Sequence, residues 1–213
     1  MEQIKNIIFD MDGVLVDSEP VILAAAIKGL EKYGVEAEPE DFTPFIGAGE
    51  DRFIGGVAEK YGVKYKKEMK DTVYDIYLDI VSDKLKVFSG TKKVLNELKE
   101  NFKLALASSA DMVKIEANLK EADISPSIFK VIIGGDDVTN KKPDPEIYTK
   151  TAEKMGVTPE SCLVVEDSVH GVKAAKAAGM KCIGITTSFS SEKLNEAGSD
   201  IICDSIDEIT SYF

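Results

Sequence analysis

The sequence predicts an α/β protein with a doubly wound parallel sheet and an all-helical domain inserted after the first strand. Six short apolar segments rich in β-branched residues recur along the chain, and helix-period segments lie between the later ones. Strands that are apolar almost throughout are typical of a parallel sheet covered by helices on both faces. About seventy residues after the first strand show only helical periodicity, which indicates the insertion.

The predicted strands are short and consist mainly of apolar residues. In chain order they span Ile4–Phe9, Lys103–Ala107, Lys130–Gly134, Cys162–Glu166, Cys182–Thr186 and Asp200–Cys203. The regular alternation of the later strands with helices predicts that they lie parallel in one sheet.

Capping residues indicate where the intervening helices begin and end. Thr91 and Asp111 are candidate N-caps, because their side chains can accept hydrogen bonds from the free N–H groups of a first turn. Pro145 falls at the first position of the next helix, and Gly156 follows its last turn. A further, alanine-rich helix stops at Gly179.

The inserted segment contains three predicted helices. Their apolar positions are Val21, Ala24, Ile27 and Leu30 in the first, Phe53, Val57 and Tyr61 in the second, and Met69, Val73, Ile76 and Ile80 in the third. Ligands of open α/β sheets bind at the carboxyl ends of the strands, so an insertion at that edge can cover the site as a lid. We expect hinges near Leu15–Glu19 and Ser82–Phe88, a core of residues 1–16 and 86–213, and a cap of residues 17–85.

Composition excludes several classes of protein. The chain has 213 residues and a net charge of −12, which argues against nucleic-acid binding. It has no run of 18 apolar residues, and its first residues do not resemble a secretory signal, so we expect a cytoplasmic protein without a membrane partner. His170 is the only histidine, which removes multi-histidine zinc sites. The cysteines, without a Cys-x-x-Cys pair, are expected to be structural thiols: Cys162, Cys182 and Cys203.

Two aspartates follow the first strand. Asp10 and Asp12 can face the same way from extended backbone, and two carboxylates held together favour a bound cation. Their hard oxygen ligands suit Mg²⁺, which also shares the oxygens of substrate phosphates. The alternative is a solvated acidic turn.

Three more strand ends carry polar groups. Ser108 and Ser109 follow the second strand, Lys142 precedes a proline-led helix after the third, and Glu166-Asp167 ends the fourth. Each group has an ordinary explanation, as a helix cap, a solvated charge or a helix-start preference. Four such groups at one edge of one sheet indicate a site.

The ordered set of segments resembles the four motifs of the haloacid dehalogenase-like superfamily. These segments are Asp10-x-Asp12-Gly13-Val14-Leu15-x-Asp17-Ser18, Ser108, Lys142-Pro143-x-Pro145 and Glu166-Asp167-Ser168-x-x-Gly171. The helical insertion is similar to the C1-type cap of the β-phosphoglucomutase-like branch. The resemblance covers essentially the whole chain and implies a Rossmann-like core.

This resemblance implies roles for the acidic residues. Asp10 would be the nucleophile that forms an aspartyl-phosphate, and Asp12 the general acid–base. Mg²⁺ would be held by Asp10, the backbone carbonyl of Asp12 and Asp167, with Glu166 in the ligand set or next to it.

The same resemblance implies roles in substrate binding and catalysis. Ser108 and Lys142 would bind the transferring phosphate and offset its charge, and with the two aspartates they complete the catalytic set. The residues assigned to substrate binding are Gly13, Ser108, Ser109, Lys142, Gly47, Glu50 and Arg52.

The cap departs from the mutase pattern. The mutases carry a histidine in the first cap helix, which Glu19–Leu23 lacks, and an arginine in the cap loop, where this chain has Glu50. Arg52, the only arginine, lies two residues later and is either a substrate clamp or, slightly favoured, a partner in a surface ion pair.

We therefore expect a Mg²⁺-dependent phosphatase that hydrolyses a small phosphorylated metabolite through an aspartyl-phosphate. A β-phosphoglucomutase-type sugar phosphomutase is the alternative, which the missing histidine and the displaced arginine disfavour. A non-enzymatic receiver domain fits poorly, because receivers are shorter and lack a helical lid. We expect a monomer.

Overall fold

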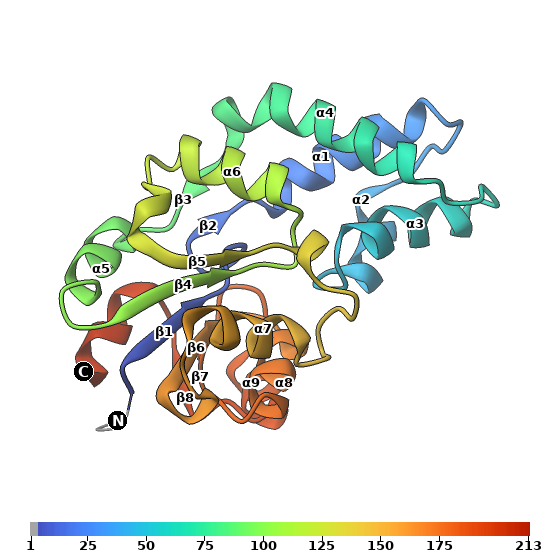
Figure 1. The fold of residues 1–213 in the computed structure, drawn as a ribbon. Helices are drawn as coiled ribbons and strands as arrows, with labels where there is room; N and C mark the ends of the chain where they lie inside the picture. The colour runs from blue at the N-terminus through green and yellow to red at the C-terminus, as the bar shows by residue number, and fades with distance from the viewer. Residues whose placement is uncertain (1–3) are drawn as a thin grey trace.

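The computed structural model of the protein describes residues 4–213 and contains a six-stranded parallel sheet. The strand order is β5-β4-β1-β6-β7-β8, so the first strand of the chain lies at the centre of the sheet (Figure 1). The strands are β1 (Asn6–Phe9), β4 (Lys103–Ala107), β5 (Phe129–Ile133), β6 (Cys162–Glu166), β7 (Lys181–Ile185) and β8 (Ile201–Cys203). The predicted α/β class and all six predicted strands are confirmed, with ends that shift by at most two residues.

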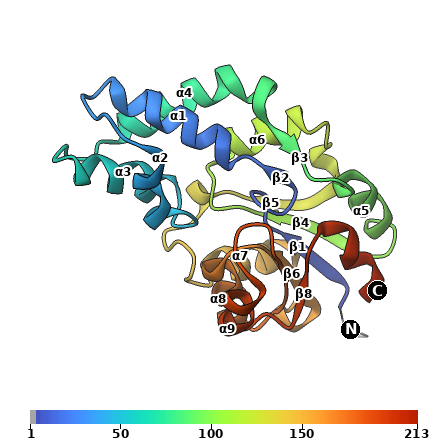
Figure 2. The same cartoon turned by 180° about the vertical axis from the view of Figure 1, so that it is seen from behind.

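Helices cover both faces of the sheet. Alternate residues of β1 enter two different apolar clusters, Ile7 and Phe9 on one side and Ile8 on the other. The first cluster also contains residues of α5 (Thr91–Leu98), α6 (Met112–Glu121) and the 3-10 segment η5 (Ile206–Tyr212). The second contains residues of α7 (Glu146–Met155), α8 (Val169–Ala177) and α9 (Ser191–Ala197), which lie on the opposite face (Figure 2).

Two predicted helix starts were wrong. Thr91 is the first residue of α5 instead of its cap, because Gly90 takes the cap position and the Thr91 hydroxyl donates to the Leu15 carbonyl, 3.0 Å away. Pro145 occupies the N-cap of α7 instead of its first helical position. Asp111 takes the N-cap position of α6 as predicted, although its side chain accepts no hydrogen bond from the first turn. The end of α7 at Gly156, which has φ of 67°, is confirmed.

The inserted segment is helical, as predicted. Its helices are α1 (Glu19–Glu31), α2 (Pro39–Phe42), α3 (Glu50–Lys60) and α4 (Lys67–Lys84), and they lie together above and to the right of the sheet in Figure 1. They share an apolar cluster of their own. The short α2 was missed, because four residues are too few to show helical periodicity. The boundaries of the cap at residues 17 and 85 stay a prediction.

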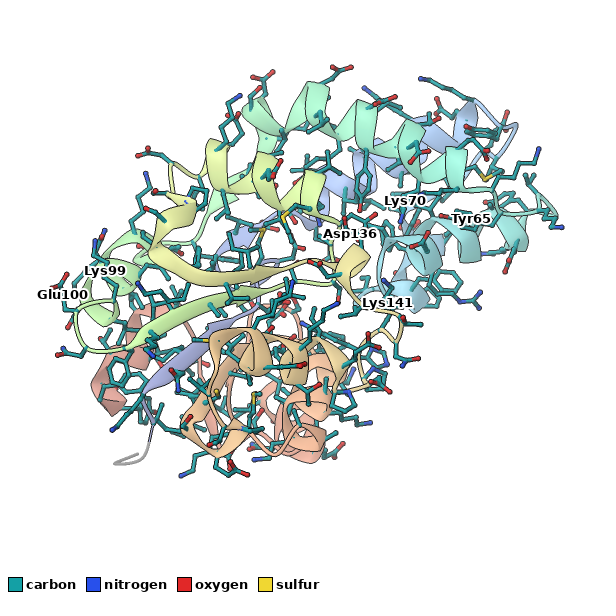
Figure 3. All side chains as sticks on the ribbon, viewed as in Figure 1. Tyr65, Lys70, Lys99, Glu100, Asp136 and Lys141 are labelled. Carbon is teal, nitrogen blue, oxygen red and sulfur yellow. The ribbon has the colours of Figure 1, made fainter. Side chains whose placement is uncertain are left out.

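The two crossings between sheet and cap lie side by side. Strand β2 (Val16–Asp17) pairs antiparallel with β3 (Lys86–Val87), so both predicted hinge regions meet in one two-stranded ribbon. A second contact between cap and core lies away from this ribbon. There the ammonium of Lys70 in α4, labelled in Figure 3, lies 2.7 Å from a carboxylate oxygen of Asp111. In residues 4–213 no helix has the length and apolarity that crossing a membrane requires.

Candidate active site

Asp10 begins the site at the carboxyl end of the central strand. Its backbone N–H donates to the Val165 carbonyl of β6 at 2.9 Å, which keeps the first residue after β1 in register with the sheet. The chain then turns sharply at Gly13, where φ is 79°. A Cβ at Gly13 would lie 1.9 Å from the Asp167 carboxylate, so only glycine fits between the two acidic segments.

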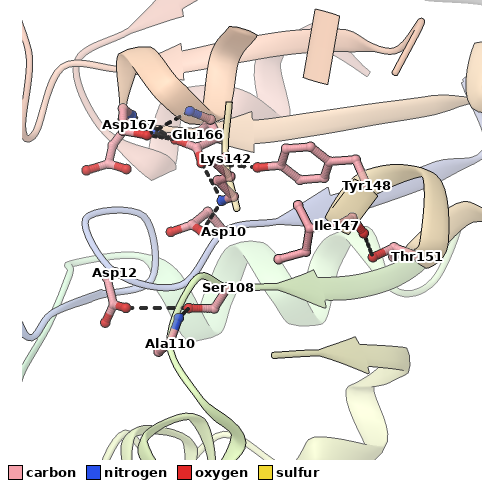
Figure 4. A network of polar contacts seen from close by, with 12 residues as sticks. Asp10, Asp12, Ser108, Ala110, Lys142, Ile147, Tyr148, Thr151, Glu166 and Asp167 are labelled. Carbon is pink, nitrogen blue, oxygen red and sulfur yellow. Dashed lines mark hydrogen bonds and ion pairs between the residues drawn. The ribbon is translucent and has the colours of Figure 1, made fainter. Parts of the chain in front are cut away.

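Lys142 connects the acidic segments. Its ammonium lies 2.6 Å from Asp10 Oδ1 and 2.6 Å from Glu166 Oε1 (Figure 4). The lysine side chain is 3% exposed, and it also lies over the Tyr148 ring, 5.0 Å from the centroid. A buried ammonium of this kind is stable only with carboxylate partners, which it has on both sides.

Both oxygens of Glu166 are already used. Oε1 accepts hydrogen bonds from Lys142 and from the Tyr148 hydroxyl, and Oε2 accepts from the N–H groups of Asp167 and Ser168 and from the Ser168 hydroxyl. A Cβ at Gly171 would lie 1.7 Å from Oε1, which explains the glycine in this motif. Glu166 is therefore a fixed anchor for Lys142.

The carboxylates repel one another. Burial, together with the charges of Glu166 and Asp12, raises the pKa of Asp10 to about 7 against the attraction of Lys142. Burial and the charges of Glu166 and Asp10 hold the pKa of Asp167 well above its usual range. Although burial opposes it, the ammonium of Lys142 lowers the pKa of Glu166. The excess of negative charge at Asp10 and Asp167 calls for a further cation.

This donor set fits a metal ion. Carboxylate oxygens of Asp10, Glu166 and Asp167 lie within 4.8 Å of one another. Asp10 and Asp167 can bind an ion there, whereas Glu166, whose oxygens accept five hydrogen bonds, lies beside it. Buried carboxylate oxygens in such a group suit a hard divalent cation. The side chain of Asp12 lies outside this group, and the role of its backbone carbonyl as a ligand, which the family resemblance implies, stays a prediction.

Asp12 has a separate set of partners. Its Oδ1 accepts from the Ser18 hydroxyl and, at 3.4 Å, from the Asn118 amide. Its Oδ2 lies 3.0 Å from the ammonium of Lys114 and 3.4 Å from the Ser108 hydroxyl (Figure 4). The two aspartates thus face different surroundings, although they are two residues apart.

Lys114 was missed by the sequence analysis. It lies in α6, its side chain is 3% exposed, and its ammonium contacts both Asp12 and, at 3.2 Å, Glu50 of α3. The carboxylates raise its pKa although burial opposes them. Lys114 and Asn118 are four residues apart, so they lie on the same face of α6, next to its apolar stripe. This spacing was the one sequence signal that could have indicated that both face the interior. A lysine at such a position is ordinarily solvated.

A cavity of about 250 Å³ lies over this edge of the sheet. The predicted residues that line it are Asp10, Asp12, Gly13, Gly47, Glu50, Ser109, Lys142, Glu166 and Asp167. Ser108 is fully buried and is not part of the lining, but its hydroxyl contacts Asp12. Ser188, also missed, lines the cavity and donates to Asp167.

Arg52 is the predicted substrate-binding residue that the structure puts elsewhere. Its guanidinium lies 3.2 Å from Glu59, both side chains are more than half exposed, and it stacks over the Phe45 ring. Arg52 does not line the cavity. The structure thus shows the surface ion pair that the sequence slightly favoured, because α3 turns Arg52 outward and Glu50 inward, and a contact of Arg52 with substrate stays a prediction.

Comparison with known proteins identifies relatives along most of the chain. Residues 7–185 match the family model described as haloacid dehalogenase-like hydrolase. The chain is 39% identical over 213 residues to the protein SUPPRESSOR OF QUENCHING 1, chloroplastic, of Arabidopsis thaliana, in an alignment that covers 98% of this chain and 20% of that protein. The chain thus spans about a fifth of the length of this relative.

A second relative matches over most of both chains. The Phosphorylated carbohydrates phosphatase of Thermotoga maritima is 37% identical over 207 residues, which cover 91% of each chain. Among solved structures, β-phosphoglucomutase from Clostridium difficile superposes with a TM-score of 0.83 at 24% identity and covers 97% of this chain and 93% of that one. This last similarity concerns the fold alone.

Proposed function

Because the chain is an enzyme that belongs to the haloacid dehalogenase-like hydrolase family, we propose that it is a Mg²⁺-dependent phosphatase acting on a small phosphorylated metabolite. The observation that carries this proposal is the separation of Asp10 from Asp12. Asp10 faces Lys142 and the acidic group, whereas Asp12 faces Lys114, Ser18 and the cap. One aspartate is suited to attack phosphorus and the other to serve the leaving oxygen.

The reaction would run in two displacements. A carboxylate oxygen of Asp10 attacks phosphorus, the bond from phosphorus to the ester oxygen breaks, and Asp12 gives a proton to that oxygen. Water then attacks the aspartyl-phosphate, loses a proton to Asp12, and the bond from phosphorus to Asp10 breaks. Lys142, held by Glu166, offsets the charge of the phosphoryl group throughout.

The residues that would hold Mg²⁺ are Asp10, Asp167 and the backbone carbonyl of Asp12. Glu166 would lie beside the ion without binding it, because its oxygens already accept five hydrogen bonds from its neighbours. When bound, the cation supplies positive charge that attracts the substrate phosphate and offsets developing charge. Residues 17–85 would act as the cap that excludes bulk water.

A sugar phosphomutase is the second candidate, since the fold resembles that of β-phosphoglucomutase. A mutase must also hold a second phosphate on the cap side. Arg52 is the only arginine in the sequence, and it is paired with Glu59 outside the cavity. It therefore does not supply a site for a second phosphate, which favours hydrolysis over the mutase reaction.

The test is a screen of phosphorylated metabolites with Mg²⁺ that includes β-glucose 1-phosphate with and without its bisphosphate activator. Release of inorganic phosphate without the activator supports the phosphatase, and glucose 6-phosphate formed only with the activator supports the mutase. Lys142→Met should lower kcat/KM by a similar factor on every donor, whereas the exposed Lys173→Met should not. Retention of wild-type activity by Lys142→Met would contradict the proposal.

A further inference from the structure

The cap side of the cavity is acidic. Asp17 of β2, Glu19 of α1 and Glu50 of α3 line it, and Lys114 is the lysine among them. Lys114 contacts both Glu50 and Asp12, so this acidic wall adjoins the aspartate that would serve the leaving oxygen. These acidic groups therefore surround the part of a substrate that differs from one phosphate ester to the next.

Neither lysine of the cavity lining is available for a second anionic group. Lys142 is held between Asp10 and Glu166, and Lys114 lies 3.0 Å from Asp12 and 3.2 Å from Glu50. An anion on the cap side would thus meet three carboxylates and an ammonium that is already shared by two. In a partly buried site such like charges repel strongly.

The remaining surface suits a small uncharged molecule. Ile22, Phe45, Ile46 and Phe53 of the cap segment also line the cavity and offer apolar surface. Hydroxyl groups can donate hydrogen bonds to carboxylates and accept them from an ammonium, so they match a cavity wall that carries both carboxylates and an ammonium. A cationic group would be attracted by the carboxylates but opposed by Lys114, which lies beside Asp12.

We propose that Asp17, Glu19 and Glu50 restrict the enzyme to phosphate monoesters of small uncharged polyols, and that they exclude esters carrying a second phosphate or a carboxylate. This inference rests on the proposed phosphatase activity and names its substrate class. Selection here works by repulsion of the wrong substrate as much as by attraction of the right one.

Matched donors test the proposal. Glycerol 2-phosphate and 2-phosphoglycerate differ in a hydroxymethyl group that becomes a carboxylate, and 2-hydroxyethyl phosphate and O-phosphoethanolamine differ in a hydroxyl that becomes an ammonium. We expect kcat/KM to be at least about tenfold higher for glycerol 2-phosphate than for 2-phosphoglycerate. O-phosphoethanolamine should be no better than 2-hydroxyethyl phosphate. p-Nitrophenyl phosphate reports the core chemistry alone.

Variants assign the selection to residues. Asp17 and Glu19 are partly exposed, and Asp17→Asn and Glu19→Gln remove the charge while keeping the shape of the side chain. Each variant should lower the ratio of kcat/KM for glycerol 2-phosphate to that for 2-phosphoglycerate several-fold. Glu59→Gln, an acid on the outer face of α3, is the matched control and should leave the ratio unchanged.

The outcomes separate this inference from the proposed function. If the protein hydrolyses neither p-nitrophenyl phosphate nor any other donor, the proposed phosphatase activity is wrong. If p-nitrophenyl phosphate is hydrolysed but 2-phosphoglycerate equals or exceeds glycerol 2-phosphate, the phosphatase stands and the inference fails. A preference for 2-phosphoglycerate that disappears in Lys114→Met would show that this lysine binds an anionic substrate group. A tenfold preference for O-phosphoethanolamine over 2-hydroxyethyl phosphate would show that the cap side selects cationic substrates instead of polyols.

Discussion

Asp10 and Asp12 illustrate how neighbouring residues of one type acquire different chemistry. The same loop carries both, yet Lys142 and the acidic group surround Asp10, while Lys114, Ser18 and Asn118 surround Asp12. The positions of both aspartates could be predicted from the sequence, because they follow a recognisable strand. The partners of Asp12 could not, since Lys114 is brought to it from a helix about a hundred residues later by tertiary packing.

Asp10→Asn should abolish turnover, because an amide cannot form the acyl-phosphate. We expect kcat to fall by several powers of ten, the scale on which nucleophile knock-outs act. Phosphate release gives the rate, and intact-mass spectrometry after mixing with substrate detects the phosphorylated protein. Asp123→Asn, an exposed aspartate paired with Lys92, is the control. Activity above about one per cent in Asp10→Asn would assign the nucleophile to another residue.

Binding of Mg²⁺ should depend on pH. In the metal-free protein the pKa of Asp10 is raised to about 7, so the carboxyl is mainly protonated below that pH and the cation must displace the proton. Affinity should therefore rise as the pH increases toward 7, and Asp167, whose pKa is also held well above its usual range, adds to this rise. Calorimetric titration of the protein with Mg²⁺, in buffers of different ionisation enthalpy, measures both the affinity and the number of protons released. An affinity that is the same on both sides of pH 7, without proton release, would show that no buried carboxyl gives up a proton.

At the scale of elements, the site depends on how each strand passes into the next loop or helix. The strands and most helices could be predicted from apolar periodicity and capping residues. The short elements β2, β3 and α2 could not, because two to four residues carry no periodic signal. The starts of α5 and α7 were each predicted one residue off, since Gly90 is the N-cap of α5 in place of Thr91, and Pro145 is the N-cap of α7 instead of its first helical residue.

Gly171→Ala tests the passage from β6 into α8. Its Cβ would lie 1.7 Å from Glu166 Oε1, and Glu166 cannot yield easily because its hydrogen bonds hold both oxygens. The displaced carboxylate would misplace Lys142, so we expect kcat to fall at least about tenfold, with a loss of about 1–3 kcal/mol in the free energy of unfolding. Lys173→Ala, an exposed position of the same helix, should change neither. Wild-type kinetics in Gly171→Ala would mean that the position of Glu166 is not required.

At the scale of the whole molecule, the cap meets the core at the β2–β3 ribbon and where α4 packs on α6, besides the Glu50–Lys114 pair at the site. The ribbon joins the two covalently. Polar groups of α4 mark the second contact: Tyr77 donates to Asn118 at 2.5 Å, and the Tyr74 hydroxyl accepts from the backbone N–H of Asp111. An inserted helical segment could be predicted from the sequence, but these contacts could not, because they join segments whose spacing along the chain carries no motif.

Lys70 gives the strongest test of this second contact. Its side chain is 7% exposed, and its ammonium lies 2.8 Å from Asp51 of α3 and 2.7 Å from Asp111, the N-cap of α6. Tyr65, labelled with Lys70 in Figure 3, donates to the same Asp51. Replacing Lys70 by Met keeps the volume and leaves two carboxylates without their shared cation.

Lys70→Met should therefore loosen the cap. We expect a loss of about 1–3 kcal/mol in the free energy of unfolding and faster amide exchange in α4 and the first turn of α6. Lys92→Met, which breaks an exposed pair with Asp123 within the core, should cost no more than about 1 kcal/mol. Denaturant unfolding and hydrogen exchange of both variants make the comparison. Equal losses in the two variants, with unchanged exchange in α4, would show that Lys70 does not hold the cap against the core, and that the β2–β3 ribbon and apolar packing alone keep the cavity covered.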